Sequence, residues 1–287
     1  MRVLYGKSVA DHIYKELIER IAILKRKNIT PVLVVIIVGN RTDSLTYISM
    51  KNKKCVELGI DSIIKRLEVT ITTSELIEII EEYNNDKSVH GILVQMPLPD
   101  TIDKNKILDA VRIDKDVDGF HCNNMGLLTV NRNPLFSPCT PVGCIELLDY
   151  YSIPIEGQNI VIIGRSTIVG LPLLLMLIHR NATVAICHSK TREIEKITRM
   201  ADIVITACGK PLMVKKEWLK KDSVVIDVGI NSIPDSSKKR GYRLVGDTDF
   251  ANVENHVSAI TPVPGGIGPL TIAILMKHTI IAAENSM

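Results

Sequence analysis

The chain has 287 residues, of which 46% are hydrophobic and 23% are charged, a composition that can fill one large globular core or two ordinary ones. A net charge of +3 and an aromatic content of 4% argue against nucleic acid as the main partner, because the positive field is weak and base-stacking side chains are few. The six cysteines are scattered without a Cys-x-x-Cys pair, which argues against a disulfide framework and against a zinc site, and favours a reducing compartment.

Signals for export and for membrane insertion are weak. The N-terminal stretch MRVLYGKSVADHIYKELIERI becomes amphipathic almost at once and lacks the apolar core of a signal peptide. The longest apolar runs, such as VLVVIIV and LPLLLMLI, are too short to span a bilayer. We therefore expect a soluble, cytoplasmic protein with neither a membrane nor a nucleic acid partner.

The first half of the chain alternates predicted helices and strands. A helix over 7–26 precedes PVLVVIIVG, a continuous apolar run typical of a buried parallel strand, and a second helix ends near Gly59. The stretch IIKRLEV predicts another strand, SELIEIIEEYNND a helix with Ser74 near its start, and HGILVQMPLP a third buried strand stopped by prolines. This alternation predicts parallel βαβ units in one α/β domain of about 130 residues.

A second α/β domain is predicted beyond residue 141. Residues 119–141 are irregular and rich in Gly, Asn and Pro, as in a passage between domains. After a helix near 141–151, the stretch QNIVIIGRSTIVGLPLLLMLIHRNATVAICHS predicts strand, glycine turn, helix and second strand, the opening of a dinucleotide-binding domain. Two further buried strands, ADIVITACG and SVVIDVG, continue the alternation, and TIAILMKHTIIAAE predicts a final apolar helix.

One lysine in the run TYISMKNKKC lies on an unexpected face of its predicted helix. With ~100° per residue, Lys51 falls roughly 40° from Tyr47, inside the apolar arc, while Lys53 points away from this arc and Lys54 lies at its edge. Lys51 could be a functional amine. It could equally extend its methylene stem along the core and place its ammonium in water, and this stretch alone favours that second interpretation.

The glycine turn GRSTIVGLP has the strand-to-helix context of a nucleotide-phosphate site, although its glycine spacing differs from the standard fingerprint and a tight turn without a ligand is the alternative. NAD enzymes usually place an acid at the end of the second strand. Here that strand runs into HSKTR, so the sequence favours NADP, whose 2′-phosphate could be bound by the basic and hydroxyl side chains Arg165, His188, Ser189, Lys190 and Arg192.

Three other stretches could bind a ligand. Gln95 lies at the carboxyl end of a predicted buried strand, where ligands bind in open α/β sheets, but it could also be a satisfied structural amide. Asp118 stands beside Gly119 in KDVDGF, which could be a simple turn. The glycines of PVPGGIGPLT allow a close backbone approach to a ligand, although they could also form a hinge.

Taken together, YISMK, VQMPLP, KDVDGFH, GRSTIVGLP and PGGIGPLT occur in the order typical of bifunctional methylenetetrahydrofolate dehydrogenase/methenyltetrahydrofolate cyclohydrolase. The chain resembles this family from about residue 4 to about residue 280. The resemblance implies NADP-dependent oxidation of 5,10-methylenetetrahydrofolate, hydrolysis of the methenyl product to 10-formyltetrahydrofolate, a role in one-carbon metabolism and purine biosynthesis, a homodimer and no metal. It also implies a folate-binding catalytic domain over 1–138 and 269–287, a Rossmann-type NADP-binding domain over 139–268, and a last helix that returns to the first domain.

The resemblance also assigns roles to residues. Lys51 matches the essential lysine, which acts in acid/base steps, and Gln95 would bond to it and tune its proton affinity. Tyr47 would stack on the folate, and Asp118 would accept hydrogen bonds from the pterin amino edge; with Lys51 and Gln95 they form the predicted catalytic set. The remaining predicted substrate contacts are Val94, Met96, Pro264, Gly265, Gly266, Ile267 and Gly268. The predicted cofactor contacts are Gly164, Arg165, Ser166, Ser189 and Ile230.

Two departures from the family pattern occur in this chain. Cys122 stands where the family usually has Pro, and Thr42-Asp43 replaces the usual Pro-Ala. Neither falls on a predicted catalytic residue, so they bear on loop geometry and relative rates. Three alternatives to the bifunctional enzyme remain: an enzyme with one of the two activities, a silent folate or NADP sensor, and a different Rossmann dehydrogenase that pairs a lysine with an aspartate.

Overall fold

A computed structural model describes residues 1–40, 42–238 and 241–286, with the backbone alone for 42–46. The departure at Thr42-Asp43 therefore lies outside the described side chains. The chain divides into two compact units. Unit 1 comprises Met1–Asp11 and Thr140–Thr271, and unit 2 comprises His12–Cys139 and Ile272–Met287.

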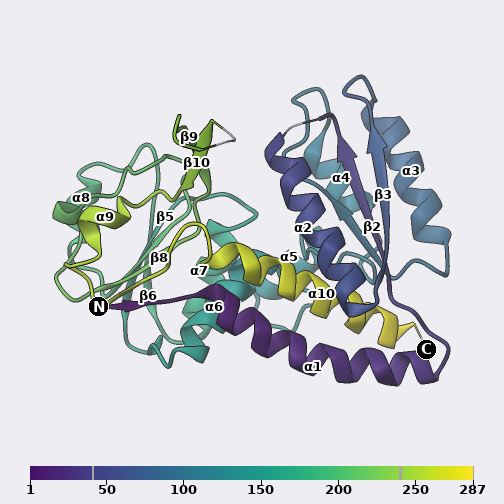
Figure 1. The fold of residues 1–287 in the computed structure, drawn as a ribbon, viewed down its shortest axis with the longest axis horizontal. Helices are drawn as coiled ribbons and strands as arrows, with labels where there is room; N and C mark the ends of the chain where they lie inside the picture. Colours follow the sequence, from purple (N-terminus) through teal and green to yellow (C-terminus); the bar gives the residue numbers. More distant parts are fainter. Residues whose placement is uncertain (41, 239–240, 287) are drawn as a thin grey trace. The chain divides into compact units, whose positions relative to one another are not determined.

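Unit 2 contains a parallel three-stranded sheet with the order β3-β2-β4. Helices α2 and α3 lie on opposite sides of this sheet (Figure 1). The strands are β2 (Val32–Val38), β3 (Asp61–Leu67) and β4 (Gly91–Val94). The helices are α1 (Gly6–Arg26), α2 (Thr42–Leu58), α3 (Thr73–Asn85), α4 (Lys104–Ala110), α5 (Cys122–Thr129) and α10 (Ile267–Asn285), of which α1 and α10 each begin in unit 1.

The central strand β2 is apolar throughout because both faces of its sheet are covered. Six of its seven residues are buried, the pattern expected for a parallel strand between two layers of helices. On one face, Val34 and Ile36 pack with Leu76 and Ile80 of α3. The start of α3 is a capping box. The Thr72 hydroxyl accepts a hydrogen bond from the backbone N–H of Glu75, and the Glu75 carboxylate accepts one from the backbone N–H of Thr72. The N-cap is therefore Thr72, and Ser74 lies in the first turn, near the start of the helix as expected.

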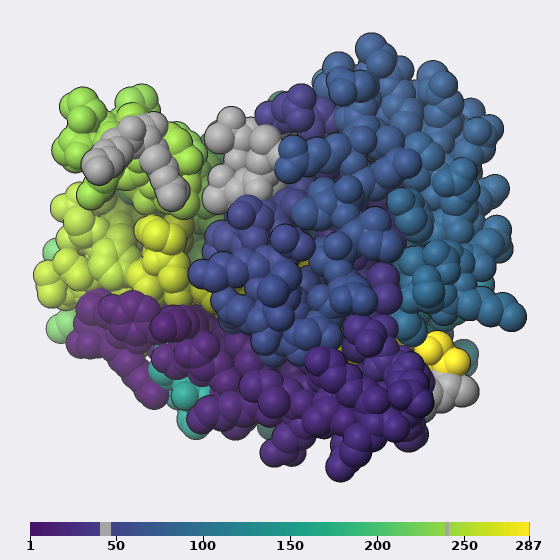
Figure 2. Space-filling view, turned by 45° about the vertical axis from the view of Figure 1, so that its right-hand side comes forward, coloured from purple at the N-terminus to yellow at the C-terminus, as the bar shows by residue number. Residues whose placement is uncertain are grey.

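Helix α10 is apolar around most of its circumference. By length and composition it could cross a membrane, but 67% of its most apolar 18-residue window is buried, which is typical of a core helix. Near its end Glu284 forms an ion pair with Arg20 of α1 at 2.5 Å. Figure 2 shows the yellow C-terminal end of the chain beside the purple α1. The predicted return of the last helix to the first domain is confirmed.

Unit 1 contains a six-stranded sheet with the order β1-β11-β8-β7-β5-β6, in which every neighbouring pair is parallel. Its strands are β1 (Arg2–Val3), β5 (Asn159–Ile163), β6 (Thr183–Cys187), β7 (Ile203–Thr206), β8 (Val224–Asp227) and β11 (Ala259–Ile260). A separate antiparallel pair is formed by β9 (Asn231–Pro234) and β10 (Tyr242–Val245). The helices are α6 (Cys139–Tyr150), α7 (Gly170–His179), α8 (Ile194–Thr198), α9 (Phe250–Val253) and the short 3-10 helix η1 (Lys216–Trp218).

The order of the strands in unit 1 creates a switch point at β5. The chain passes from β5 to β6 on one side and then to β7 on the other side. Ligands bind outside the carboxyl ends of parallel strands where the winding reverses in this way. The fold thus confirms the predicted class, two α/β units with a doubly wound sheet in the predicted cofactor-binding one, unit 1, and it places the glycine turn after β5 at the switch point.

Several short elements were not expected from the sequence, among them α4, α5, β1 and the pair of β9 and β10. The passage 119–141 contains an eight-residue helix, α5, whose N-cap His121 accepts a hydrogen bond from the backbone N–H of Asn123. Its Gly, Asn and Thr content gives little helix propensity, so a local cap and tertiary contacts decide its conformation. The first strand, β1, was not expected because two residues carry no periodic pattern, yet Arg2 and Val3 pair with β11.

Candidate active site

Lys51 projects from α2 into the interior of unit 2 and is 6% exposed. Its Nζ donates a hydrogen bond of 2.8 Å to Oε1 of Gln95. The alternative interpretation of Lys51 was a side chain that lies along the core and ends in water. The burial of Lys51 and its bond to Gln95 do not agree with that interpretation. Burial lowers the pKa of Lys51, while the nearby Asp118 carboxylate acts in the opposite direction.

Of the other two lysines of this helix, Lys53 is exposed and Lys54 is partly buried. The Lys53 side chain is 80% exposed, and Lys54 pairs with Glu57 while its Nζ lies 4.4 Å from the centroid of the Tyr14 ring. Both positions agree with the helical wheel. The three lysines thus differ in environment as their spacing predicted, and Lys51 is the buried one.

Gln95 follows β4 directly and its amide has a defined orientation. Its Nε2 donates to the carbonyl of Met96 at 2.7 Å, so Oε1 is the atom left to accept from Lys51. The backbone N–H of Gln95 donates to the carbonyl of Ile36 and prolongs the ladder between β2 and β4. Val94, the last residue of β4, is buried. The sheet edge therefore holds Gln95 and orients its acceptor toward the lysine.

Asp118 lies on the loop after residue 115 and is partly buried. Burial raises the pKa of its carboxyl group, and the charge of Lys51 acts against that rise. The loop is organised by Asp116, whose carboxylate accepts from the backbone N–H groups of Phe120 and His121 and from the side-chain amide of Asn124. Burial raises the pKa of Asp116 to about 7 in spite of these bonds.

Tyr47 lies one helical turn before Lys51 on α2 and is partly buried. Burial raises the pKa of its phenol to about 12, so the hydroxyl is a neutral donor and acceptor near pH 7. The spacing of four residues in a helix places both side chains on one face of α2. All four residues of the predicted catalytic set, Tyr47, Lys51, Gln95 and Asp118, belong to unit 2.

The structure adds two buried groups that the sequence did not single out. The Cys139 thiol lies 3.3 Å from the carbonyl of Val117, and its pKa is raised by burial and by Asp118. His278 of α10 lies behind it, with Nδ1 at 2.8 Å from the same carbonyl and 3.7 Å from the Cys139 sulfur. A cysteine and a histidine far apart in the chain carry no spacing signal, so only the fold could bring them together.

In unit 1, the glycine turn after β5 lies against the end of β7. Gly164 has φ of +133°, and a Cβ atom there would come within 2.1 Å of the carbonyl oxygen of Ala207. A Cβ at Gly170 would in turn come within 2.0 Å of the Gly164 carbonyl oxygen. Ser166 accepts from the backbone N–H of Val169 through Oγ, and α7 begins at Gly170. This tight turn leads directly into the N-terminus of α7, the position at which a pyrophosphate is bound in dinucleotide-binding units.

The residues predicted to contact the cofactor lie around the same edge of the unit 1 sheet. Arg165 and Ser166 are exposed in the glycine turn, Ser189 is exposed just after β6, and Ile230, 39% exposed, follows β8. The loop after β6 is itself ordered, since His188 accepts from the backbone N–H of Lys190 through Nδ1. The exposed guanidinium of Arg165 and the hydroxyl groups of Ser166 and Ser189 are hydrogen-bond donors of the kind that bind the phosphate groups of a dinucleotide.

The predicted substrate loop over 264–268 is also in unit 1, where it leads into α10. The backbone N–H of Gly6 donates to the carbonyl of Gly265 at 3.0 Å, and a Cβ at Gly6 would come within 1.7 Å of the Gly266 carbonyl oxygen. The predicted contact Pro264 lies in the same loop, which the start of α1 thus supports by direct backbone contact, whereas Ile267 and Gly268 form the first two residues of α10. The backbone peptide before Pro264 is cis.

These features define a class of protein. Unit 1 is a dinucleotide-binding unit with a phosphate turn at its switch point, and unit 2 carries a buried, hydrogen-bonded lysine beside a carboxylate, a combination suited to oxidoreduction together with acid/base chemistry. The chain belongs to the tetrahydrofolate dehydrogenase/cyclohydrolase family: the model of the family's catalytic domain matches residues 4–118, and that of its NAD(P)-binding domain matches residues 138–287.

Individual relatives are similar over nearly the whole chain. Bifunctional protein FolD 4, chloroplastic, from Arabidopsis thaliana is 50% identical over 98% of this chain and 79% of its own length. The crystal structure of the bifunctional enzyme FolD from Campylobacter jejuni has a TM-score of 0.94 at 45% identity and covers 100% of both chains. The Trypanosoma brucei enzyme, solved with NADP and an inhibitor, has a TM-score of 0.95 at 40% identity and covers 99% of this chain and 97% of that chain.

Proposed function

We propose that this protein oxidises 5,10-methylenetetrahydrofolate with NADP and hydrolyses the resulting 5,10-methenyltetrahydrofolate to 10-formyltetrahydrofolate. The observation that carries this proposal is Lys51, a buried amine that is bonded to Gln95 and lies near Asp118. A protein that merely bound folate or NADP would have no use for such a lysine. Membership of the dehydrogenase/cyclohydrolase family supports both activities.

Hydrolysis of the methenyl group needs a base to activate water. Because burial lowers the pKa of Lys51, its neutral amine is more accessible near pH 7 than that of an exposed lysine, and it can accept the proton that water loses as it adds to the methenyl carbon. The same ammonium can return a proton to N5 when the N5–carbon bond breaks. The neutral amine then accepts the proton of the adduct's hydroxyl group, so that a formyl group remains on N10 and one proton is finally released to solvent. Gln95 keeps the amine in position through its fixed Oε1 acceptor.

NADP, when bound, supplies the acceptor for the hydride that the methylene carbon loses. The chain contributes the phosphate turn at Gly164 to Ser166 and the helix N-terminus behind it. NADP is favoured over NAD because β6 ends at Cys187 and runs into basic and hydroxyl side chains, with no acid that would repel a 2′-phosphate before Glu193. Asp118 would bind the pterin amino edge, for which its two carboxylate oxygens are suitable acceptors.

Three further parts of the proposal rest on family resemblance and composition. The protein acts as a homodimer, which light scattering of the purified protein would test. It is cytoplasmic and makes 10-formyltetrahydrofolate for purine synthesis. Fluorescent tagging of the full chain would test its location, and purine dependence of a deletion strain would test the role of its product.

The decisive experiment measures methylene oxidation and methenyl hydrolysis side by side in the wild type and in Lys51→Met. We expect both activities in the wild type and a loss of hydrolysis of about 100-fold or more in the variant, the range over which a positioned acid/base group contributes. Lys53→Met is the matched control, because Lys53 is on the same helix but 80% exposed, and its activity should be unchanged.

Other outcomes would select an alternative. A wild type with one activity would be a monofunctional enzyme, and a wild type that binds folate without either activity would be a sensor. A Lys51→Met enzyme that hydrolyses as fast as the wild type would remove the lysine from the mechanism, whatever the oxidation rate.

A further inference from the structure

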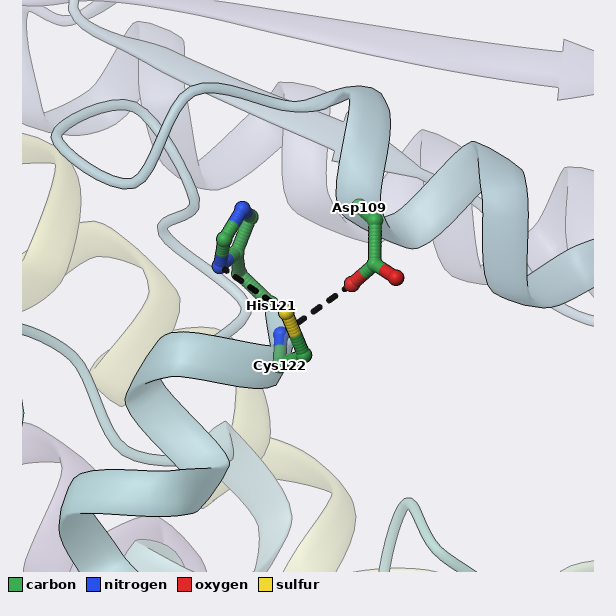
Figure 3. Close-up of side chains that lie close together, drawn as sticks. All are labelled: Asp109, His121 and Cys122. Atoms are coloured by element: carbon green, nitrogen blue, oxygen red, sulfur yellow. Dashed lines mark hydrogen bonds between the residues drawn. The ribbon is translucent and has the colours of Figure 1, made fainter.

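A cluster of three metal-ligating side chains lies in unit 2, away from the predicted catalytic set. Asp109 near the end of α4, His121 at the N-cap of α5 and Cys122 at its first position each offer one ligand atom, and these atoms lie within 4.8 Å of one another. Figure 3 shows Cys122 between the other two side chains. The sulfur of Cys122 is 3.9 Å from Nδ1 of His121, and the Cys122 backbone N–H donates to Asp109 at 3.2 Å.

We propose that Asp109, His121 and Cys122 form a binding site for a thiophilic divalent cation of the zinc type. Thiolate, imidazole and carboxylate are the ligands that such an ion takes, at about 2.0 to 2.3 Å, and in a tetrahedral site the ligand atoms are then about 3.3 to 3.8 Å apart. A pair of ligand atoms at the full separation of 4.8 Å needs a contraction of about 1.0 to 1.5 Å to reach that geometry. Since Asp109 and Cys122 are exposed, a fourth position is open to water, and Asn123 Oδ1, 3.9 Å from the sulfur, is a further oxygen nearby.

The backbone that carries two of the ligands is held in place by buried bonds. Asp116, 4% exposed, accepts from the backbone N–H of His121 at 2.8 Å and from the side-chain amide of Asn124 in the next turn. The buried Asp116 carboxylate therefore holds the start of α5 in place. The Cys122 backbone N–H, in turn, holds the exposed Asp109 carboxylate beside it. A cation would find both segments already adjacent, so little ordering has to accompany its binding.

The charges of the ligands suit a divalent cation. A bound divalent ion displaces the thiol proton of Cys122, and the resulting thiolate and the Asp109 carboxylate together balance its two charges. These two negative ligands also offset the partial positive charge of the α5 N-terminus.

The alternative is a purely structural cluster in which His121 Nδ1 caps α5 by accepting from the backbone N–H of Asn123 at 3.1 Å. A cation bound at Nδ1 would replace that bond. The variant His121→Asn separates the two roles, because Asn is a good N-cap that retains an acceptor oxygen but lacks the imidazole. Cys122→Pro is a second test, since Pro is favoured at the first position of a helix and removes the thiol. Because Pro also removes the N–H that bonds to Asp109, Cys122→Ala, which keeps this N–H, is measured beside it.

The test uses the full-length protein, freed of metal, and titrates it with cobalt(II) chloride and with zinc chloride in the absence of folate and NADP. We expect one ion per chain, with a thiolate-to-cobalt charge-transfer band that zinc displaces. We also expect zinc to protect one thiol from a disulfide reagent. Affinity should fall about tenfold or more in Cys122→Pro, Asp109→Asn and His121→Asn, and it should be unchanged in Asp100→Asn, which removes an exposed carboxylate elsewhere in the unit.

Absence of the charge-transfer band in the wild type would overturn the proposal, as would equal affinity in Cys122→Pro. Near-ultraviolet circular dichroism of each variant checks that weaker binding does not reflect unfolding, and agreement between the cysteine and histidine variants excludes a chance effect of one substitution. Because none of these readouts uses catalysis, the result is independent of the proposed folate activities.

Discussion

At the scale of single residues, burial lowers the pKa of Lys51, and the hydrogen bond to Gln95 holds the buried amine in place. The bond is 2.8 Å long and its acceptor is a neutral amide oxygen, which orients the amine without adding a negative charge. Burial can therefore keep the pKa of Lys51 low. A carboxylate in place of the amide would stabilise the ammonium form instead.

Gln95→Glu should consequently slow methenyl hydrolysis at pH 7 by about tenfold, because each unit by which the pKa of the lysine rises removes about nine-tenths of the neutral amine. The rate should recover at higher pH. The measurement is the pH profile of hydrolysis for the wild type and the variant. A uniform loss of rate at every pH would show that Gln95 acts through packing instead.

At the scale of elements, the turn between β5 and α7 depends on two glycines that lie against neighbouring backbone. Gly164 combines a φ of +133° with an approach to the Ala207 carbonyl that leaves no space for a Cβ. Backbone atoms cannot move aside as the end of a long side chain can. The turn, the end of β7 and the start of α7 are therefore fixed together, and a change at this position affects the whole phosphate site.

Gly164→Ala should destabilise the protein by about 2 kcal/mol or more and weaken NADP binding, because it adds backbone strain and a steric clash. Urea unfolding and a titration of NADP would measure the two effects. The control is Gly126→Ala in α5, where a Cβ has free space and should be neutral or slightly stabilising. Wild-type stability in Gly164→Ala would contradict the close approach of Gly164 to Ala207.

At the scale of the whole molecule, helix α10 carries a histidine into the interior of unit 2. His278 is 7% exposed, and burial lowers its pKa to about 4, although the hydrogen bond to the Val117 carbonyl opposes that decrease. Its ordinary pKa in the unfolded chain is about 6.5. Between these two values the unfolded chain binds more protons than the folded one, so acid favours unfolding.

The stability that depends on neutral His278 is thus fully present above pH 6.5 and is lost as the pH falls toward 4. From pH 7 to pH 4.5 the wild type should lose roughly 2 to 3 kcal/mol more unfolding free energy than His278→Gln, which does not titrate in this range. Urea unfolding at several pH values would measure this difference. Parallel pH curves for the two proteins would contradict it. Asp116 and Asp227 have raised pKa values, so their protonation in acid favours the folded state. Because both residues are present in the two proteins, their contributions cancel in the comparison.

Much of this protein is determined by local sequence pattern. Continuous apolar runs such as VLVVIIV specify strands buried on both faces, and the period of α2 separates Lys51 from Lys53 and Lys54, because strand and helix geometry translate spacing directly into direction. The motifs also placed the predicted catalytic and phosphate residues in their separate units. Contacts between distant segments leave no such periodic trace. The pairing of β1 with β11, the placement of Cys139 and His278 beside one carbonyl, and the meeting of Asp109 with His121 and Cys122 were therefore decided by the tertiary structure, which alone brings these segments together.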